Sequence, residues 1–259
     1  MKKTALITGA SGGLGLSLAR LFAKDGYDLV IVARNEERLN DVSEELSSLG
    51  ASVTALAKDL TDPQAPKDIY LETARRCITV DVLVNNAGFG DFGEFAESDL
   101  EKQSDMINLN VSALVKLTHL YLKDMKGRKS GNIMNVASIA AFQSGPLMSV
   151  YYATKAFVLS FSEALSVELR GSGVKVTVLC PGPIETGFEK RADLQKSGLF
   201  KNLKVWSPEK VADFGYKKMK GGRVVCIKGA INKLIVFSSR LAPRALVRNA
   251  VYHIQKPKK

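Results

Sequence analysis

Short apolar runs alternate along the chain with longer segments in which apolar residues recur every three or four positions. The strand-like runs lie at 4–8, 28–34, 52–57, 80–84, 132–138 and 175–180, and the helix-like segments at 14–24, 69–76, 100–124 and 151–170. A strand covered on both faces needs an almost continuous apolar run, whereas a covering helix needs one apolar stripe. The alternation therefore predicts a single α/β domain, with a doubly wound parallel sheet between two layers of helices.

A glycine-rich turn joins the first predicted strand to the first predicted helix. It contains Gly9, Gly13 and Gly15, a variant of the spacing found in dinucleotide-binding turns. Glycine permits positive φ and close approach of the backbone, and the free N–H groups at the helix start attract a pyrophosphate. Such turns also occur without a ligand, but a strand before it and a helix after it favour a Rossmann-type site for a dinucleotide.

The end of the second predicted strand indicates which nicotinamide dinucleotide is bound. An acidic residue about 20 positions after the glycines would bind the ribose 2′-hydroxyl of NAD, whereas an arginine would pair with the 2′-phosphate of NADP. Here the strand ends in Ala33 and Arg34. The sequence therefore predicts NADP(H), the alternative being that Arg34 is an ordinary exposed cation.

The candidate chemistry lies on the helix predicted at 151–170. Tyr151 and Lys155 are four residues apart and so share one helix face. A phenol has a pKa of about 10 and is a poor acid at neutral pH, so we expect the lysine to lower the tyrosine pKa towards neutrality. Ser138 ends the run at 132–138, at the edge of the sheet where ligands bind. An isolated pair of this kind is usually a solvated helix face, so the accompanying motifs carry the argument.

As a set, these motifs resemble the classical short-chain dehydrogenase/reductase family, from Lys3 to about Gly229, and most of all its branch that reduces 3-oxoacyl chains or steroid ketones. The resemblance implies four catalytic residues: Asn110, Ser138, Tyr151 and Lys155. It also implies a cofactor site formed by Gly9, Ser11, Gly13, Leu14, Gly15, Arg34, Asp59, Leu60, Asn86, Ala87, Gly88, Asn110, Tyr151, Lys155, Pro181, Gly182, Ile184 and Thr186.

Some of these residues have simpler explanations, and one position departs from the family pattern. Asn86 and Gly88 would also serve as turn formers, and Asp59 as a helix N-cap. Many NADP-binding members carry a basic residue within the glycine turn, where this chain has Gly12. The 2′-phosphate would therefore depend mainly on Arg34.

The resemblance implies reduction of a carbonyl to a secondary alcohol by NADPH. Ser138 and Tyr151 would bind the carbonyl oxygen, and Tyr151 would donate the proton. Lys155 would lower the tyrosine pKa and hold the nicotinamide ribose, while Asn110 positions a water that returns protons. The alternative is a non-catalytic NADP-binding sensor or scaffold, because a fold does not determine a function.

Apolar residues follow several motifs at positions where a substrate would lie. Ala140, Phe142 and Phe188 are the candidates, and Phe89, Phe92 and Phe95 are further aromatic residues near the site. A mostly apolar pocket favours a hydrophobic ketone or a 3-oxoacyl chain, free or linked to coenzyme A or a carrier protein. The simpler interpretation is ordinary burial within loops.

Positive charge is concentrated near the C-terminus. The net charge is +11, and twelve Lys or Arg but no Asp or Glu follow Asp213. Apolar and basic residues alternate within 230–259, and Pro243 would begin a second helix. We expect two short amphipathic helices that extend a catalytic domain at 1–229. They would form a substrate lid, a contact with an anionic membrane, a site for acidic groups or a subunit contact, whereas nucleic acid is the least favoured partner.

The remaining composition indicates a cytoplasmic enzyme, with peripheral membrane contact as the alternative. Three cysteines show neither metal spacing nor an even disulfide set, and two histidines are too few for a metal site. The N-terminus does not fit a secretory signal, and every apolar stretch is shorter than the ~20 residues that span a bilayer. The expected assembly is a homodimer or homotetramer, with no metal.

Overall fold

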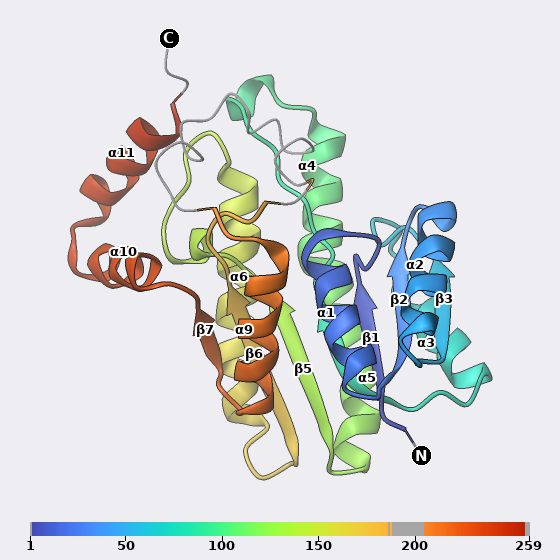
Figure 1. The fold of residues 1–259 in the computed structure, drawn as a ribbon. Helices are drawn as coiled ribbons and strands as arrows, with labels where there is room; N and C mark the ends of the chain where they lie inside the picture. The colour runs from blue at the N-terminus through green and yellow to red at the C-terminus, as the bar shows by residue number, and fades with distance from the viewer. Residues whose placement is uncertain (1, 186, 188–204, 257–259) are drawn as a thin grey trace.

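The computed structural model describes residues 2–185, 187 and 205–256, and within them seven parallel strands form one sheet in the order β3-β2-β1-β4-β5-β6-β7 (Figure 1). The strands are β1 Thr4–Thr8, β2 Asp28–Ala33, β3 Val53–Ala57, β4 Val80–Asn85, β5 Gly131–Val136, β6 Val174–Cys180 and β7 Val225–Ile227. Neighbouring residues of a strand point to opposite faces: Ile7 packs in one apolar cluster and Leu6 in the other. The predicted doubly wound sheet is confirmed.

Helices cover both faces of this sheet. The structure has α1 Gly13–Lys24, α2 Glu36–Ser48, α3 Ala65–Arg75, α4 Leu100–Ile107, α5 Leu114–Gly127, α6 Ser149–Glu168, α9 Pro208–Lys220, α10 Ala230–Leu241 and α11 Arg244–Gln255. Buried residues of α1, α2 and α9 share one apolar cluster with the strands, and those of α3, α5 and α6 share the other. The three layers expected from the apolar pattern are therefore present, with the main cores between the sheet and the helices.

Among the described residues, two α-helices and one strand were not predicted, and one predicted helix is interrupted. Helices α2 and α9 and the short strand β7 were missed. Both helices begin with a recognisable N-cap, because the side chains of Asn35 and Ser207 accept hydrogen bonds from main-chain N–H groups of the first turn. The helix expected at 100–124 consists of α4, a π-helical segment at Asn108–Ala113, and α5. The wider segment contains Asn110, and such insertions frequently occur at functional sites.

The order of the strands determines where a ligand can bind. From β1 the chain passes to β2 and β3 on one side, and it then returns to place β4 on the other side. The carboxyl ends of β1 and β4 therefore lie side by side at the point where the direction of winding changes. In open sheets of this kind, ligands bind in the crevice outside such strand ends.

The C-terminal helices lie beside the sheet, beyond β7 (Figure 1). They are separated at Ala242 and Pro243, close to the break expected from the sequence. Gln255 at the end of α11 donates a 2.7 Å hydrogen bond to the hydroxyl of Tyr152 on α6, and Val251 packs with Ala140. In the described part of the chain, no helix is long and apolar enough to cross a bilayer.

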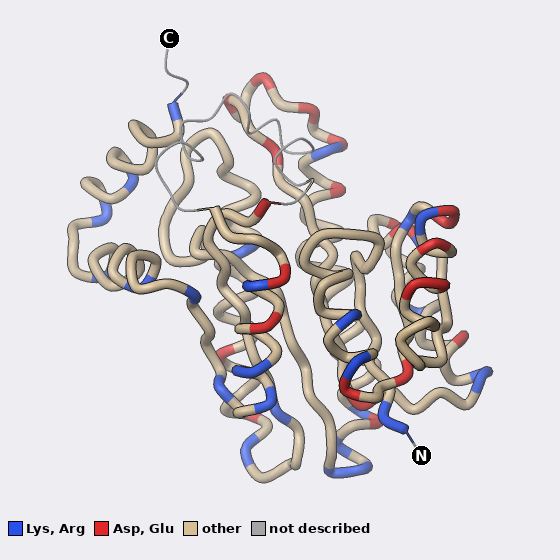
Figure 2. The backbone as a smooth tube through the Cα atoms, in the orientation of Figure 1, with Lys and Arg blue, Asp and Glu red and all other residues tan. Residues whose placement is uncertain are grey.

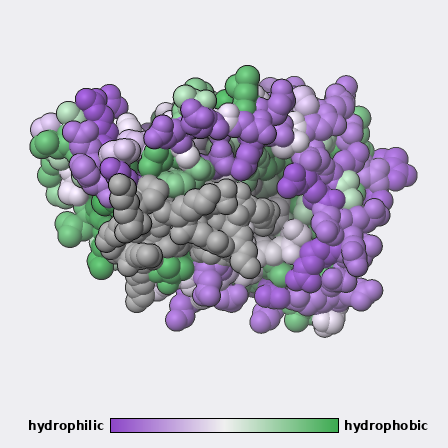
Figure 3. All heavy atoms as spheres, turned by 90° about the horizontal axis from the view of Figure 1, so that it is seen from above, coloured by the Kyte–Doolittle hydropathy of each residue, from purple (hydrophilic) through white to green (hydrophobic). Residues whose placement is uncertain are grey.

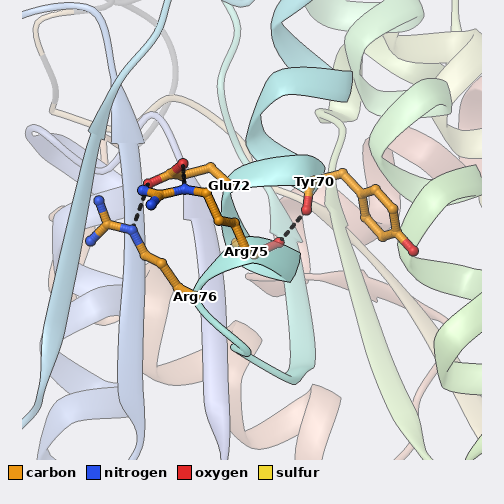
Figure 4. A network of polar contacts seen from close by, with 5 residues as sticks. Tyr70, Glu72, Arg75 and Arg76 are labelled. Carbon is orange, nitrogen blue, oxygen red and sulfur yellow. Dashed lines mark hydrogen bonds and ion pairs between the residues drawn. The ribbon is translucent and has the colours of Figure 1, made fainter.

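The solvent-facing side of α3 has a network of ion pairs (Figure 4). Glu72 accepts hydrogen bonds from Arg75 and Arg76 at 2.7 and 2.6 Å, and these bonds lower its pKa to about 2. Exposed pairs of this type contribute little to stability. None of the three residues lines the cavity described below, so this network is a feature of the surface.

Candidate active site

A cavity of about 1160 Å³ lies at the carboxyl ends of the strands and extends from the glycine turn to the C-terminal helices. Its volume exceeds the ~300–1,000 Å³ of a typical ligand pocket, which allows a dinucleotide and a substrate together. Of the expected cofactor residues, those that line it are Gly9, Ser11, Gly13, Leu14, Gly15, Arg34, Asp59, Leu60, Asn86, Ala87, Gly88, Tyr151, Lys155, Pro181, Gly182 and Ile184. Thr186 lies outside the described residues.

The glycine turn is shaped to receive an anionic group. Gly9 and Gly13 have φ values of +67° and +53°, which favour glycine. A Cβ atom on Gly15 would lie 2.2 Å from the carbonyl oxygen of Gly9, so the turn tolerates no side chain there. No side chain caps the N-terminus of α1, and its first turn has no acidic residue. The helix start is therefore available to a phosphate.

Thr8 and Asn86 join the glycine turn to the end of β4. The hydroxyl oxygen of Thr8 accepts hydrogen bonds from the main-chain N–H groups of Asn86 and Ala87, both at 3.0 Å. The Asn86 side chain donates to the carbonyl oxygens of Thr8 and Gly9 at 2.8 and 3.2 Å. Asn86 thus fixes the cradle as well as lining it, which is more than a turn former does.

Arg34 lies at the end of the cavity where the sequence places the 2′-phosphate. Its guanidinium is 3.6 Å from the carboxylate of Asp59, and the side chain is 63% exposed. Burial would raise the pKa of Asp59, but hydrogen bonds from Thr61 and the charge of Arg34 lower it below its usual value. The Asp59 carboxylate holds the turn at Thr61 and does not cap α3, which starts at Ala65.

Two further cations near Arg34 were missed in the sequence. Lys58 lines the cavity and forms a 3.1 Å ion pair with Asp68. Arg38 on α2 donates a 3.2 Å hydrogen bond to the main-chain oxygen of Ser11 within the glycine turn. Lys58 could have been found from the sequence, because it directly precedes the predicted cofactor residue Asp59. Arg38 could have been found only if helix α2 had been predicted.

Tyr151 and Lys155 lie on α6, and Lys155 is deeply buried. The Lys155 ammonium is 5.8 Å from the centre of the Tyr151 ring and donates a 2.9 Å hydrogen bond to the main-chain oxygen of Val136. Gly88 makes room for this arrangement: a Cβ there would lie 3.4 Å from the Lys155 nitrogen and 2.8 Å from the side-chain oxygen of Asn110. The structure therefore brings these candidates together around one small residue.

Asn110 and Ser138 are held by their neighbours. The Asn110 side chain accepts a hydrogen bond from the N–H of Phe89 and donates to the oxygen of Phe89 and the hydroxyl of Thr154, at 2.9–3.1 Å. Ser138 accepts a 3.1 Å hydrogen bond from the N–H of Ala140, at the start of the 3-10 helix Ile139–Phe142. Ser138 lines the cavity, whereas Asn110 lies behind the wall.

Burial determines the pKa values of the tyrosine and lysine. It raises the pKa of Tyr151 to about 12, although a hydrogen bond with Ser138 acts in the opposite direction. Burial also lowers the pKa of Lys155 to about 8, because the charged form loses its hydration. The expected fall in the tyrosine pKa is therefore wrong for the protein chain alone, because desolvation of the phenol outweighs the hydrogen bond with Ser138.

The end of the cavity where the sequence places the substrate is formed largely by the C-terminal helices. Ala140 lines it as expected, but Phe142 does not: its ring packs near α10, with the guanidinium of Arg240 5.6 Å from its centre. Phe188 lies outside the described residues. The wall residues of α10 and α11 are Ile235, Ser238, Ser239, Ala242, Leu246, Val247, Ala250, Val251 and Ile254. No local motif marks these residues, because only the tertiary fold brings them to the site.

Comparison with known proteins assigns the family. The short chain dehydrogenase family matches residues 3–197, which include the glycine turn, Ser138 and the Tyr151–Lys155 pair. The chain belongs to this family of oxidoreductases, whose cofactor is a nicotinamide dinucleotide. The catalytic residues expected from the resemblance all lie within the matched region.

Three similar proteins illustrate the relationship. Ketoacyl reductase HetN of Nostoc sp. is 31% identical over 90% of this chain and 78% of its own length. Mouse 17-beta-hydroxysteroid dehydrogenase type 3 is 36% identical over 73% of this chain, which corresponds to only 63% of that longer protein. The solved structure of a short-chain dehydrogenase from Sphingobium yanoikuyae in complex with NADPH has a TM-score of 0.82 and 32% identity, covering 92% of this chain and 94% of that one.

The pKa of Lys155 leads to a prediction about pH-dependent stability. Between about pH 8 and its ordinary pKa of 10.5, the unfolded chain holds a proton on Lys155 that the folded chain has lost. Raising the pH through this range therefore increases this lysine's contribution to the free energy of unfolding, by up to about 3 kcal/mol. The Lys155→Met variant lacks the titrating group. As the pH rises through this range, wild type should therefore become more stable relative to the variant, as measured by urea denaturation without cofactor.

The matched control is Lys67→Met, which removes an exposed lysine of α3. Comparing each variant with wild type cancels the titration of all other groups. A difference between wild type and Lys155→Met that does not change with pH would contradict the burial argument.

Proposed function

We propose that this chain is an NADP(H)-dependent carbonyl reductase that converts an apolar ketone to a secondary alcohol. The observation that carries the proposal is the continuity of the cavity. It joins the glycine turn and Arg34 to Ser138, Tyr151 and Lys155, and then to a largely apolar wall from α10 and α11. Residues 1–229 would form the cofactor and catalytic unit, and 230–259 would complete the substrate wall.

In this proposal Ser138 and Tyr151, which both line the cavity, bind the carbonyl oxygen. Bound NADPH supplies the hydride for the carbonyl carbon, and the oxygen must then gain a proton. With a pKa of about 12, Tyr151 is protonated at neutral pH and can donate that proton. Lys155 has a pKa of about 8 and is mostly protonated at pH 7, so its charge stabilises the phenolate that remains.

Asn110 would contribute to proton return through its main chain. Its side-chain amide is already used by Phe89 and Thr154. A water between Asn110 and Lys155 would therefore bind the main-chain carbonyl within the π-helical segment. In this proposal Lys155 passes a proton to Tyr151 and regains one from that water.

The preference for NADP rests on a group of cations. Arg34, Lys58 and Arg38 come from three different segments near the same end of the cavity. The Arg34 side chain is exposed, and at 3.6 Å its ion pair with the Asp59 carboxylate is loose. The guanidinium can therefore turn to a phosphate without losing a tight ion pair. The NADPH complex of the Sphingobium relative supports the same cofactor.

The apolar wall and the names of two relatives support a hydrophobic substrate. Val247 and Val251 pack near Ala140, Met148 and Tyr152, beside the candidate acid. One relative is named a ketoacyl reductase and another a hydroxysteroid dehydrogenase. A ketone with a long chain or fused rings fits a wall of this composition better than a small polar one.

Tyr151→Phe removes the transferable proton and keeps the ring. General acid catalysis contributes about 10²–10⁴-fold, so kcat should fall by this factor while the Kd for NADPH changes little. Tyr152→Phe is the matched control: it loses the hydrogen bond with Gln255 but no transferred proton. Retained turnover in Tyr151→Phe, or its loss only in Tyr152→Phe, would contradict the assignment.

Arg34→Ala should weaken NADPH binding much more than NADH binding. A charge-assisted hydrogen bond contributes about 1.5–3 kcal/mol, which corresponds to a rise of about 10–100-fold in the Kd for NADPH. Arg75→Ala, which removes an exposed arginine of α3, is the control. Fluorescence titration of both cofactors tests this, and equal losses for NADPH and NADH would show that Arg34 does not bind the phosphate.

The substrate class is tested by measuring NADPH oxidation with a series of ketones of graded length and ring size. The series includes one acyl chain both as a free ketone and as a coenzyme A thioester. The kcat/KM should rise with apolar size, and Val247→Ser should reduce it about tenfold for the largest ketones and less for the smallest. Asn249→Ser, an exposed change on the same helix, is the control. NADPH binding without turnover of any ketone would favour the sensor or scaffold alternative.

A further inference from the structure

Helix α10 presents an apolar stripe to the solvent. Ile231, Leu234, Phe237 and Leu241 are 64%, 65%, 61% and 72% exposed. Their spacing of three and four residues places them on one face of the helix. The opposite side of the helix is occupied, because Asn232 and Val236 are buried. The stripe is therefore a second apolar face, in addition to the one that packs against the protein.

This exposed surface continues into the mouth of the substrate cavity. Leu246 and Ile254 of α11 are 64% and 42% exposed, and both also line the cavity. Ser238 of α10 and Ala242, directly after the helix, line the same cavity, and Ser238 lies between the stripe residues Leu234 and Leu241 along the helix. The apolar surface and the cavity entrance thus share residues.

The charged residues of α10 and α11 are all basic, and Glu163 of α6 lies beside those of α10. Lys233 and Arg240 lie on α10, and Arg244 and Arg248 lie on α11 (Figure 2). No acidic residue follows Asp213 in the sequence. Seen from above, apolar and polar groups alternate at the end of the molecule formed by these helices (Figure 3). An occupant of this surface must accept apolar side chains and also supply negative charge.

A second copy of the chain meets these requirements poorly. A twofold symmetric contact through α10 and α11 would bring the same surface of both copies together, and with it basic residues against basic residues. An amphipathic helix with cations on its polar side is instead the usual form of a segment that lies in an anionic lipid interface. Each Lys or Arg near such a surface strengthens binding about fivefold.

We propose that α10 and α11 dock on an anionic lipid surface, with the apolar stripe inserted among the lipids and the mouth of the cavity facing them. Docking itself is independent of the proposed function. If the chain reduces a hydrophobic ketone, this arrangement supplies the substrate directly from the lipid phase, and that consequence rests on the proposed function.

The test is co-sedimentation of the full-length protein with vesicles of phosphatidylglycerol and phosphatidylcholine. Wild type should bind them, and Leu234→Ser/Leu241→Ser should reduce the partition coefficient by at least about tenfold, because each buried leucine contributes about 1.5–3 kcal/mol. Leu71→Ser, which changes a leucine that is 52% exposed on α3, is the matched control and should bind like wild type. NADPH binding by each variant verifies that it is folded.

The electrostatic part is tested on the same vesicles. Lys233→Gln/Arg248→Gln should weaken binding, as should high salt, because charges are screened over about 10 Å at 0.1 M ionic strength. Vesicles of phosphatidylcholine alone should bind less protein than the anionic vesicles. Equal binding to both kinds of vesicle would overturn the role of the cations.

Two outcomes would overturn the proposal as a whole. The first is that the wild-type protein does not bind the anionic vesicles, or that the Leu234→Ser/Leu241→Ser variant binds them as well as wild type does. The second is that the wild-type protein is a dimer that does not bind vesicles, and that the two substitutions convert this dimer to a monomer. That result would assign the stripe to a contact with a second copy. Binding is measured without ketone or turnover, so a failure here is distinguishable from a failure of the proposed reaction.

Discussion

The hydrogen bonds between Thr8 and Asn86 hold together the two strand ends on which the site is built. The Thr8 hydroxyl accepts from two main-chain N–H groups after β4, and the Asn86 amide donates back to the turn after β1. One strand end leads into the glycine turn, and the other leads to Gly88, beside which Asn110 and Lys155 pack. The glycine turn and the candidate catalytic residues therefore share one anchor, and a shift of either strand would misplace both.

A second constraint is the burial of the two groups that we propose exchange protons. In the chain alone, the pKa of Tyr151 is raised to about 12 and that of Lys155 is lowered to about 8. Burial favours the neutral form of each, so the phenol keeps its proton until an oxygen that develops negative charge is placed beside it. The C-terminal helices contribute to the same constraint, because their apolar residues form much of the wall around the tyrosine.

Local sequence predicted the features that depend on local geometry. Nearby residues determine the glycine turn, the strands, the helix that carries both Tyr151 and Lys155, and the break near Pro243. Features that depend on long-range packing were missed or wrong. Phe142 faces Arg240 instead of the cavity, and burial raises the tyrosine pKa that was expected to fall. A lid from α10 and α11 was only one of several alternatives, and the fold shows which of their residues line the cavity. The π-helical segment around Asn110 likewise has no apolar period that would separate it from α4 and α5.

In the proposed reaction, hydride passes from NADPH to a ketone carbon within this cavity, and the chain supplies the proton. The most direct measurement incubates wild-type protein with an apolar ring ketone and NADPH that carries two deuterium atoms at nicotinamide C4. The product alcohol should then contain one deuterium on its carbinol carbon, as detected by mass spectrometry and NMR. An alcohol with no deuterium at that carbon, or no alcohol with any ketone while NADPH remains bound, would contradict it.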